Sequence, residues 1–138
     1  MNFGYNLTSF QGRLNRQPFW LSIILMIIVT WILEYILFMI FGVSFVMPDP
    51  SASPDAQAAA MMDMYAKMGP ALAILTLITL WPNLAIYTKR WHDRNKSGWW
   101  SLLFFLPVIG WIWIFIECGF LRGTPGPNSY GEDPLAGR

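Results

Sequence analysis

The sequence predicts an all-α integral membrane protein, a three-helix bundle in a single domain over residues 1–138. Of its residues, 55% are hydrophobic and only 12% are charged, whereas a soluble domain usually carries about 25% charged residues. The apolar residues gather in three segments, at about 19–42, 70–88 and 99–121. Crossing the hydrocarbon core takes about 20 helical residues, and backbone groups in lipid must bond internally, so each segment is predicted to be a spanning helix.

The first segment, 19–42, contains one charged residue, Glu34. Its apolar run is too long for a cleavable signal peptide, so it is expected to remain as an anchor. A carboxyl group at that depth costs about 2.5 to 3.5 kcal/mol on insertion scales, so Glu34 should face the bundle interior. Asn83, in the second segment, is its expected partner. The pair is either part of a polar path or a buried interhelical hydrogen bond, and the sequence leaves both open.

The loop between the first two segments, residues 43–69, is predicted to hold a short amphipathic helix over 54–68. Ser53 can cap this helix, and apolar residues follow Ala58 at i+3, i+4 and i+7, on one face. Gly69 and the following proline are expected to end it. We expect the helix to lie on the outer membrane surface or to cap the bundle.

Basic residues indicate the orientation. Residues 1–18 contain Arg13 and Arg16 and no acid, and loop 89–98 contains four basic residues, whereas loop 43–69 is mainly acidic. Short loops rich in Lys and Arg stay in the cytoplasm. The N-terminus and loop 89–98 are therefore predicted to be cytoplasmic, in a multi-pass protein.

The third segment, 99–121, is interrupted by Pro107 and Gly110. Its length favours a kinked full span, which would put the tail outside. The alternative is a re-entrant hairpin, which would return the tail to the cytoplasm. The tail, 122–138, is rich in Gly and Pro and is predicted to be a series of turns.

Three stretches resemble one family. They are FQGRLNRQPFW at 10–20, KRWHDRNKSGWW at 89–100 and GTPGPNSYGEDP at 123–134. In this order, around three apolar segments, they resemble the bacterial inner-membrane family known as domain of unknown function 805. The resemblance implies a small three-segment inner-membrane protein and implies no reaction. Lys89 departs from the pattern, since the family more often has arginine there, and lysine cannot form a bidentate contact.

A basic face is the predicted binding site. Basic side chains near a membrane attract anionic headgroups by about 1 kcal/mol each. The predicted site, for anionic lipid or a membrane-protein partner, comprises Arg13, Arg16, Lys89, Arg90, His92, Asp93 and Arg94. The more conservative interpretation is that the bases set the topology and that His92 and Asp93 latch the loop to the bundle. If the tail lies on the same side, it would add Asn128, Tyr130 and Asp133.

The leading functional hypothesis is a non-enzymatic protein that binds lipid or a partner, with a homo-oligomer left open. The alternative is a small oligomeric transporter or channel component with a polar path through Glu34, Asn83 and His92. An enzyme using His92 and Asp93 would need a nucleophile or metal that the sequence does not supply. With one histidine and one cysteine, Cys118, neither a metal site nor a cofactor is expected. Nucleic-acid binding is not expected, because the basic stretch is short and adjoins the membrane.

Overall fold

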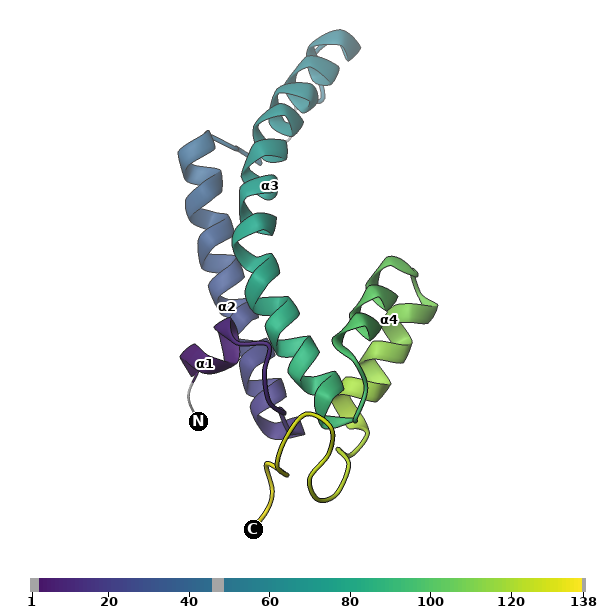
Figure 1. Cartoon of the computed structure of the whole chain (residues 1–138). Coiled ribbons are helices and arrows are strands. Elements are labelled where there is room, and N and C mark those ends of the chain that lie inside the picture. Colours follow the sequence, from purple (N-terminus) through teal and green to yellow (C-terminus); the bar gives the residue numbers. More distant parts are fainter. Residues whose placement is uncertain (1–2, 46–48, 138) are drawn as a thin grey trace. The chain divides into compact units, whose positions relative to one another are not determined.

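The computed structural model describes residues 3–45 and 49–137. Within them the regular structure is entirely helical, which confirms the all-α prediction (Figure 1). In chain order the elements are α1 (Phe3–Thr8), α2 (Arg16–Phe41), α3 (Pro54–Asp93), the 3₁₀-helix η1 (Gly98–Phe105), α4 (Ile109–Ile114) and the π-helix η2 (Phe115–Phe120).

The chain divides into two compact units. The first unit contains Met1–Met26 and Leu80–Arg138, and the second contains Ile27–Thr79. Helices α2 and α3 therefore each contribute one end to the first unit and the other end to the second. The candidate site described below lies entirely within the first unit.

Two helices, α2 and α3, are long and apolar enough to cross a membrane. α2 has 26 residues. α3 has 40 residues, so at about 1.5 Å per residue it is about 60 Å long, twice the thickness of the hydrocarbon core, about 30 Å. Its apolar part, 70–88, is by itself long enough for a crossing.

The prediction of a separate helix over 54–68 is wrong, because α3 continues through Gly69 and Pro70. Its predicted start is confirmed: the Ser53 hydroxyl accepts a hydrogen bond from the Ala56 amide at 3.3 Å. Proline lacks an amide hydrogen, so Pro70 removes one bond inside the helix. Apolar membrane helices tolerate such a gap, which explains why the proline does not end the helix.

The third apolar segment is a helical hairpin, so the prediction of one continuous span over 99–121 is wrong. The chain reverses between η1 and α4 (Figure 1), as in the re-entrant alternative. The reversal is sharp, since Val108 adopts a φ of 65°. The two arms lie close together at Gly110, where an added Cβ would lie 1.9 Å from the Leu103 carbonyl oxygen. A side chain at this position would force the arms apart.

The hairpin begins with a tight contact to α3. The Ser97 hydroxyl caps η1 by accepting a hydrogen bond from the Trp99 amide at 3.4 Å. At Gly98 an added Cβ would lie 2.5 Å from Cγ2 of Thr88. The Ser97-Gly98 step therefore lets the chain leave α3 and turn back close beside it.

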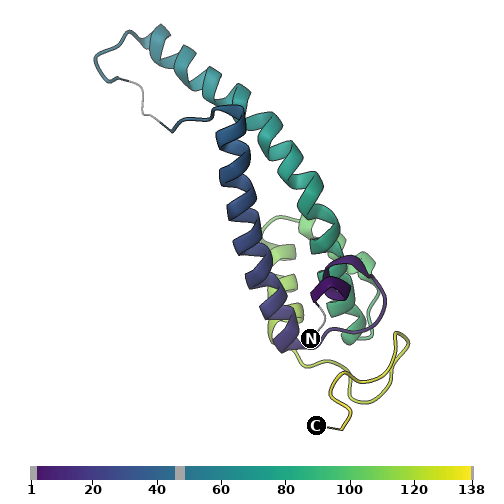
Figure 2. The ribbon, with the colours of Figure 1, turned by 90° about the vertical axis from the view of Figure 1, so that its left-hand side faces the viewer.

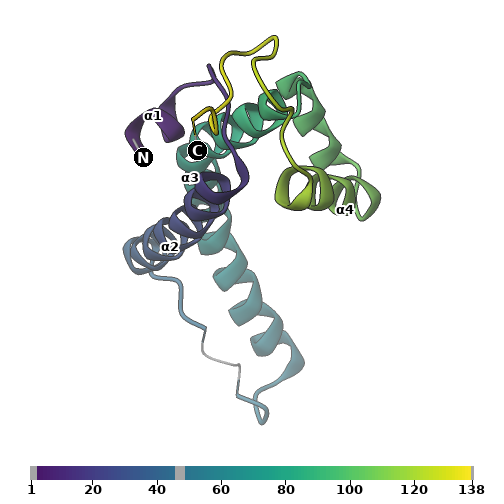
Figure 3. The ribbon, with the colours of Figure 1, turned by 90° about the horizontal axis from the view of Figure 1, so that it is seen from below.

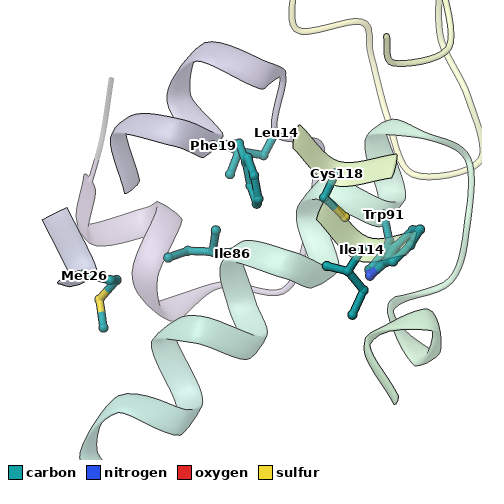
Figure 4. Close-up of a cluster of buried hydrophobic side chains, with 7 residues drawn as sticks. All are labelled: Leu14, Phe19, Met26, Ile86, Trp91, Ile114 and Cys118. Carbon is teal, nitrogen blue, oxygen red and sulfur yellow. The ribbon is translucent and has the colours of Figure 1, made fainter. Parts of the chain in front are cut away.

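A buried apolar cluster joins the elements of the first unit (Figure 4). Its members are Leu14, Phe19, Met26, Ile86, Trp91, Ile114 and Cys118. Edge-to-face aromatic contacts extend the cluster, with Tyr87 5.6 Å from Phe19 and 5.1 Å from Phe104, centroid to centroid. On the second arm, Phe115 lies 6.1 Å from Trp20 of α2, centroid to centroid. The ribbons of this arm and of α2 are drawn in Figure 2. The start of α2, the end of α3 and the hairpin thus share one core.

The second unit has a smaller core. Ala71 and Leu75 of α3 are buried, whereas large apolar side chains such as Trp31 and Leu77 are exposed. Such a surface suits contact with lipid, since apolar side chains facing acyl chains avoid water. α3 also carries an i,i+4 ion pair here, with Lys67 Nζ 2.6 Å from Asp63 Oδ2.

Candidate functional site

Asp93, at the end of α3, lies between two buried arginines. Its Oδ1 accepts a hydrogen bond from Arg13 Nε at 3.1 Å, and its Oδ2 accepts one from Arg90. The side chain of Asp93 is 3% exposed, that of Arg13 is 1% exposed and that of Arg90 is fully buried. Charges with so little access to water are tolerated only when paired and hydrogen-bonded. These three residues therefore form a structural ionic cluster.

Arg90 uses its remaining donors to hold the base of the hairpin. Nε donates to the Cys118 carbonyl at 2.6 Å, and Nη2 donates to the Leu121 carbonyl at 2.5 Å. A weaker bond, at 3.4 Å, runs from Nη1 to the Leu14 carbonyl. Arginine can do this because its planar guanidinium carries five donors. The end of α3 is thus bonded to the last turn of the hairpin and to the residue that follows it.

Arg13 anchors the tail in the same way. Nη1 donates to the Gly126 carbonyl and Nη2 to the Thr124 carbonyl, both at 2.6 Å. Just before Thr124, the tail passes directly over Asp93. An added Cβ at Gly123 would lie 2.1 Å from Asp93 Oδ2. Only glycine allows the tail to lie this close. Figure 3 shows the tail, in yellow, beside the end of α3.

Lys89, which departs from the family pattern, is also buried and bonded internally. Nζ donates to the carbonyls of Tyr5 and Asn6 at 2.8 and 2.7 Å, near the end of α1, where lone helical carbonyls favour a cation. The Lys89 carbonyl accepts a bond from the Leu14 amide at 3.1 Å. The lysine therefore fixes the N-terminal segment to α3.

The base of the hairpin holds a second ionic cluster. Glu117 accepts hydrogen bonds from Arg94 Nε at 3.0 Å and from Lys96 Nζ. Arg94 Nη1 also donates to the Arg122 carbonyl. The one acidic residue of the third apolar segment is thus neutralised at the hairpin base.

The tail packs on His92. The rings of His92 and Tyr130 are stacked, with centroids 3.8 Å apart and an interplanar angle of 6°. His92 Nδ1 lies 3.2 Å from the Gly12 carbonyl, and a carbonyl only accepts, so this nitrogen carries the hydrogen. Asn128 Nδ2 donates to the His92 carbonyl at 2.9 Å. The latch expected from the sequence is present, and it includes the tail.

Asp133 stabilises a turn of the tail. Its carboxylate accepts hydrogen bonds from the Leu135 and Gly126 amides, each at 2.9 Å. These bonds favour the ionised form and hold the pKa of Asp133 below its ordinary value. The three tail residues predicted as additional site residues therefore all help to fix the tail.

A pocket of about 740 Å³ opens beside this network. It is lined by Arg13, Asn15, Arg16, Gln17, Trp20, Asp93, Gly119, Arg122, Gly123, Thr124, Pro125, Asp133 and Leu135. Two of its arginines, Arg16 and Arg122, are exposed. Arg16 Nη1 donates to the Phe120 carbonyl at 3.1 Å. Arg16 belongs neither to the Asp93 cluster nor to the Glu117 cluster. The pocket thus combines arginine donors with the first residues of α2, where helical amides favour an anion.

Sequence reasoning missed Arg122. The missed signal is its position: it ends the third apolar segment, immediately before the GTPGPNSYGEDP stretch. Had the hairpin been preferred to the full span, Arg122 would have been placed on the same face as Arg16.

The predicted intramembrane pair remains a prediction. Glu34 lies in α2 within the second unit, and Asn83 lies in α3 within the first unit. Over residues 3–45 and 49–137, no three His, Cys, Asp or Glu side chains are grouped so as to hold a metal ion.

The three motifs of the sequence lie together in this network. The model of the family described as "Protein of unknown function (DUF805)" matches residues 7–132. The chain belongs to the DUF805 family. Motifs 10–20, 89–100 and 123–134 of this DUF805 protein are joined by Arg13, Asp93 and the tail carbonyls, so they describe one structural unit.

Curated relatives of this DUF805 protein come from Escherichia coli. "Inner membrane protein YhaH" (strain K12) is 32% identical over 131 residues, 94% of this chain and 89% of the relative. "Inner membrane protein YhaI" (strain K12) is 32% identical over 133 residues, 96% and 91% of the two chains. "Uncharacterized protein YiiR" (strain K12) is 28% identical over 152 residues, 92% and 86% of the two chains. No solved structure matches significantly.

The comparisons confirm the predicted class of protein. Relatives along almost the whole chain are named inner membrane proteins, and α2 and α3 are apolar enough to cross a membrane. This DUF805 chain is accordingly an all-α bacterial inner-membrane protein. The number of crossings and the orientation remain predictions.

Proposed function

We propose that this DUF805 protein is a non-enzymatic membrane protein that binds the anionic headgroup of a phospholipid. The binding site is the pocket between the start of α2 and the tail. Its principal ligands are Arg16 and Arg122, and its walls are fixed by the Arg13–Asp93–Arg90 cluster. The observation that carries the proposal is the pocket itself, with two exposed arginines on a scaffold of buried ones.

The difference between buried and exposed basic residues supports this assignment. Of the predicted binding residues, Lys89, Arg90 and Asp93 are buried, and Arg94 is paired with Glu117. They are bonded within the protein and are not available to a headgroup. The contact with ligand therefore shifts to Arg16, from the predicted set, and to Arg122.

The charge of the pocket favours an anion. Its lining includes three arginines, at 13, 16 and 122, against two aspartates, at 93 and 133, which leaves one net positive charge (3 − 2). Asp93 is already matched by Arg90 from outside the lining. A phosphate would meet guanidinium donors in the geometry that arginine provides for bidentate bonds.

The position and size of the pocket suit a headgroup. The volume of about 740 Å³ falls within the usual range of small-molecule pockets, about 300 to 1,000 Å³. Trp20 lines it and donates through Nε1 to the Gly119 carbonyl at 3.1 Å, and tryptophan is enriched at the headgroup level. In the orientation predicted from the basic loops, the pocket faces the cytoplasmic leaflet.

The test is titration of the full-length protein, in non-ionic micelles, with dihexanoyl phosphatidylglycerol. We expect saturable binding that weakens more than tenfold in the Arg16→Gln, Arg122→Gln double variant. Each hydrogen bond to a charged group is worth about 1.5 to 3 kcal/mol, and about 1.4 kcal/mol corresponds to tenfold. Lys67→Gln is the matched control, since Lys67 is an exposed base paired with Asp63 in the second unit.

Two results would contradict the proposal. One is equal binding of phosphatidylglycerol by the double variant and the control. The other is equal binding of phosphatidylcholine of the same chain length, since that lipid carries no net charge. Competition by inorganic phosphate at the same concentration as the lipid would identify a general phosphate site instead. An unfolding midpoint of the double variant close to that of the control would show that its fold is intact.

A further inference from the structure

The hairpin of η1, α4 and η2 exposes most of its large apolar side chains. Near its turn, Phe105 is 84% exposed, Ile109 67% and Val108 62%. From Trp99 to Ile116 the sequence has no charged residue. An apolar surface of this extent in water marks contact with a membrane or a partner.

The length of the hairpin suits half a bilayer. Its second arm, Ile109–Phe120, has 12 residues, which at about 1.5 Å each span about 18 Å. The hydrocarbon core is about 30 Å thick. One arm therefore reaches about the midplane and is too short to cross.

The turn is built to tolerate a medium without water. Four amides at the turn donate within the hairpin: Leu106 to the Leu103 carbonyl at 3.0 Å, Ile109 to Pro107 at 2.8 Å, Gly110 to Leu106 at 2.9 Å and Ile112 to Val108 at 3.0 Å. Pro107 has no amide hydrogen to satisfy. Trp111, although exposed, donates through Nε1 to the Phe104 carbonyl at 2.9 Å. Unpaired backbone groups in hydrocarbon cost several kcal/mol each, and these bonds avoid that cost.

Both ends of the hairpin return to the same end of the first unit. The first arm begins at Gly98 against Thr88 of α3. The second arm ends at Phe120, whose carbonyl bonds to Arg16 at the start of α2. The charged residues, Glu117 with Arg94 and Lys96, are confined to this base.

We infer that the hairpin inserts into a single leaflet of the bilayer and turns back within it. Its exposed apolar surface therefore contacts lipid acyl chains. With α2 and α3 as the two full crossings, the N-terminus, loop 89–98 and the tail all lie on one face of the membrane. Trp99 and Trp100, at the base, lie at the headgroup level of that leaflet. The inference is independent of the proposed headgroup site.

The first test is the side of the two termini, with reporters fused before Met1 or after Arg138. One reporter is active only outside the cytoplasm and the other fluoresces only inside. We expect both termini on the same face. Termini on opposite faces would mean three full crossings and would overturn the inference.

The second test places the turn in lipid. Phe105→Cys and, as control, Ser129→Cys in the exposed tail are labelled with a fluorophore in the full-length protein in liposomes, while Cys118 is buried and stays unlabelled. Nitroxides on the acyl chains should quench the label at 105 several-fold more than the label at 129. Equal quenching at the two positions would overturn the inference. It would mean that water or a second copy of the chain covers the hairpin.

Discussion

Removing the charge of Asp93 should destabilise the protein more than any other single loss of charge in the first unit. In Asp93→Asn, Arg13 and Arg90 remain buried with no counter-charge. Both lose a charge-assisted hydrogen bond to the carboxylate, each worth about 1.5 to 3 kcal/mol. Breaking a buried ion pair by removing one partner typically costs about 3 to 5 kcal/mol. The two estimates overlap, so we expect a loss of about 3 to 5 kcal/mol in the free energy of unfolding.

The assay is unfolding in mixed micelles by increasing amounts of a denaturing detergent, followed by circular dichroism. Asp63→Asn is the matched control: it also removes one carboxylate paired with a base, but the Asp63 side chain is 63% exposed. Exposed pairs contribute about 0 to 1 kcal/mol. A loss in Asp93→Asn within 1 kcal/mol of the control would refute the view that the cluster is buried and holds the unit together.

Three further predictions concern the tail and the hairpin. Gly123→Ala should release the tail, because its Cβ would lie 2.1 Å from Asp93 Oδ2. Amide hydrogen exchange at Thr124 should become at least tenfold faster. The control Gly69→Ala, whose Cβ would meet no neighbour within 4 Å, should leave this exchange rate unchanged. Asp133 has a lowered pKa in the fold, so its contribution to stability is present above the ordinary carboxyl pKa and is lost as the pH falls through the folded pKa; the Leu135 amide resonance should titrate with a midpoint below 3.8, and a midpoint at or above it would contradict the hydrogen bonds. Val108→Gly should raise the free energy of unfolding by about 1 kcal/mol, because a β-branched residue is strained at a φ of 65°; unchanged stability in the detergent assay would argue against that strain.

The sequence predicted the helices well where local physics determines them. The apolar run after Phe19 forms α2, and Ser53 begins α3 as a cap should. The end at Gly69 and Pro70 was misplaced, because local helix-breaking signals are weaker in an apolar helix. A single span over 99–121 was predicted because the segment is long enough to cross a membrane. The prediction was wrong because the chain reverses between η1 and α4. Pro107 and Gly110 indicated the reversal only as the alternative, because it depends on a positive φ at Val108, which valine rarely adopts.

The buried ionic cluster consists of three of the seven residues that the sequence predicts as a binding face, namely Arg13, Arg90 and Asp93. The sequence predicts that they contact anionic headgroups, because basic residues near a membrane attract them. Their burial depends on carbonyl partners far along the chain, such as Cys118 for Arg90 and Thr124 for Arg13. Those partners belong to the backbone, and backbone carbonyls leave no trace in the sequence.

The cluster around Arg13 also sets an order of events during synthesis. Arg13 leaves the ribosome early, but its bonds to Thr124 and Gly126 span 111 and 113 residues. Until the tail has been made, Arg13 lacks its carbonyl acceptors at Thr124 and Gly126. Closing so long a loop costs conformational entropy, and the bonds that offset this cost form only after the tail has been synthesised. Assembly of this network is therefore a late step, and a chain truncated before residue 124 would leave Arg13 buried with Asp93 but without its tail carbonyls.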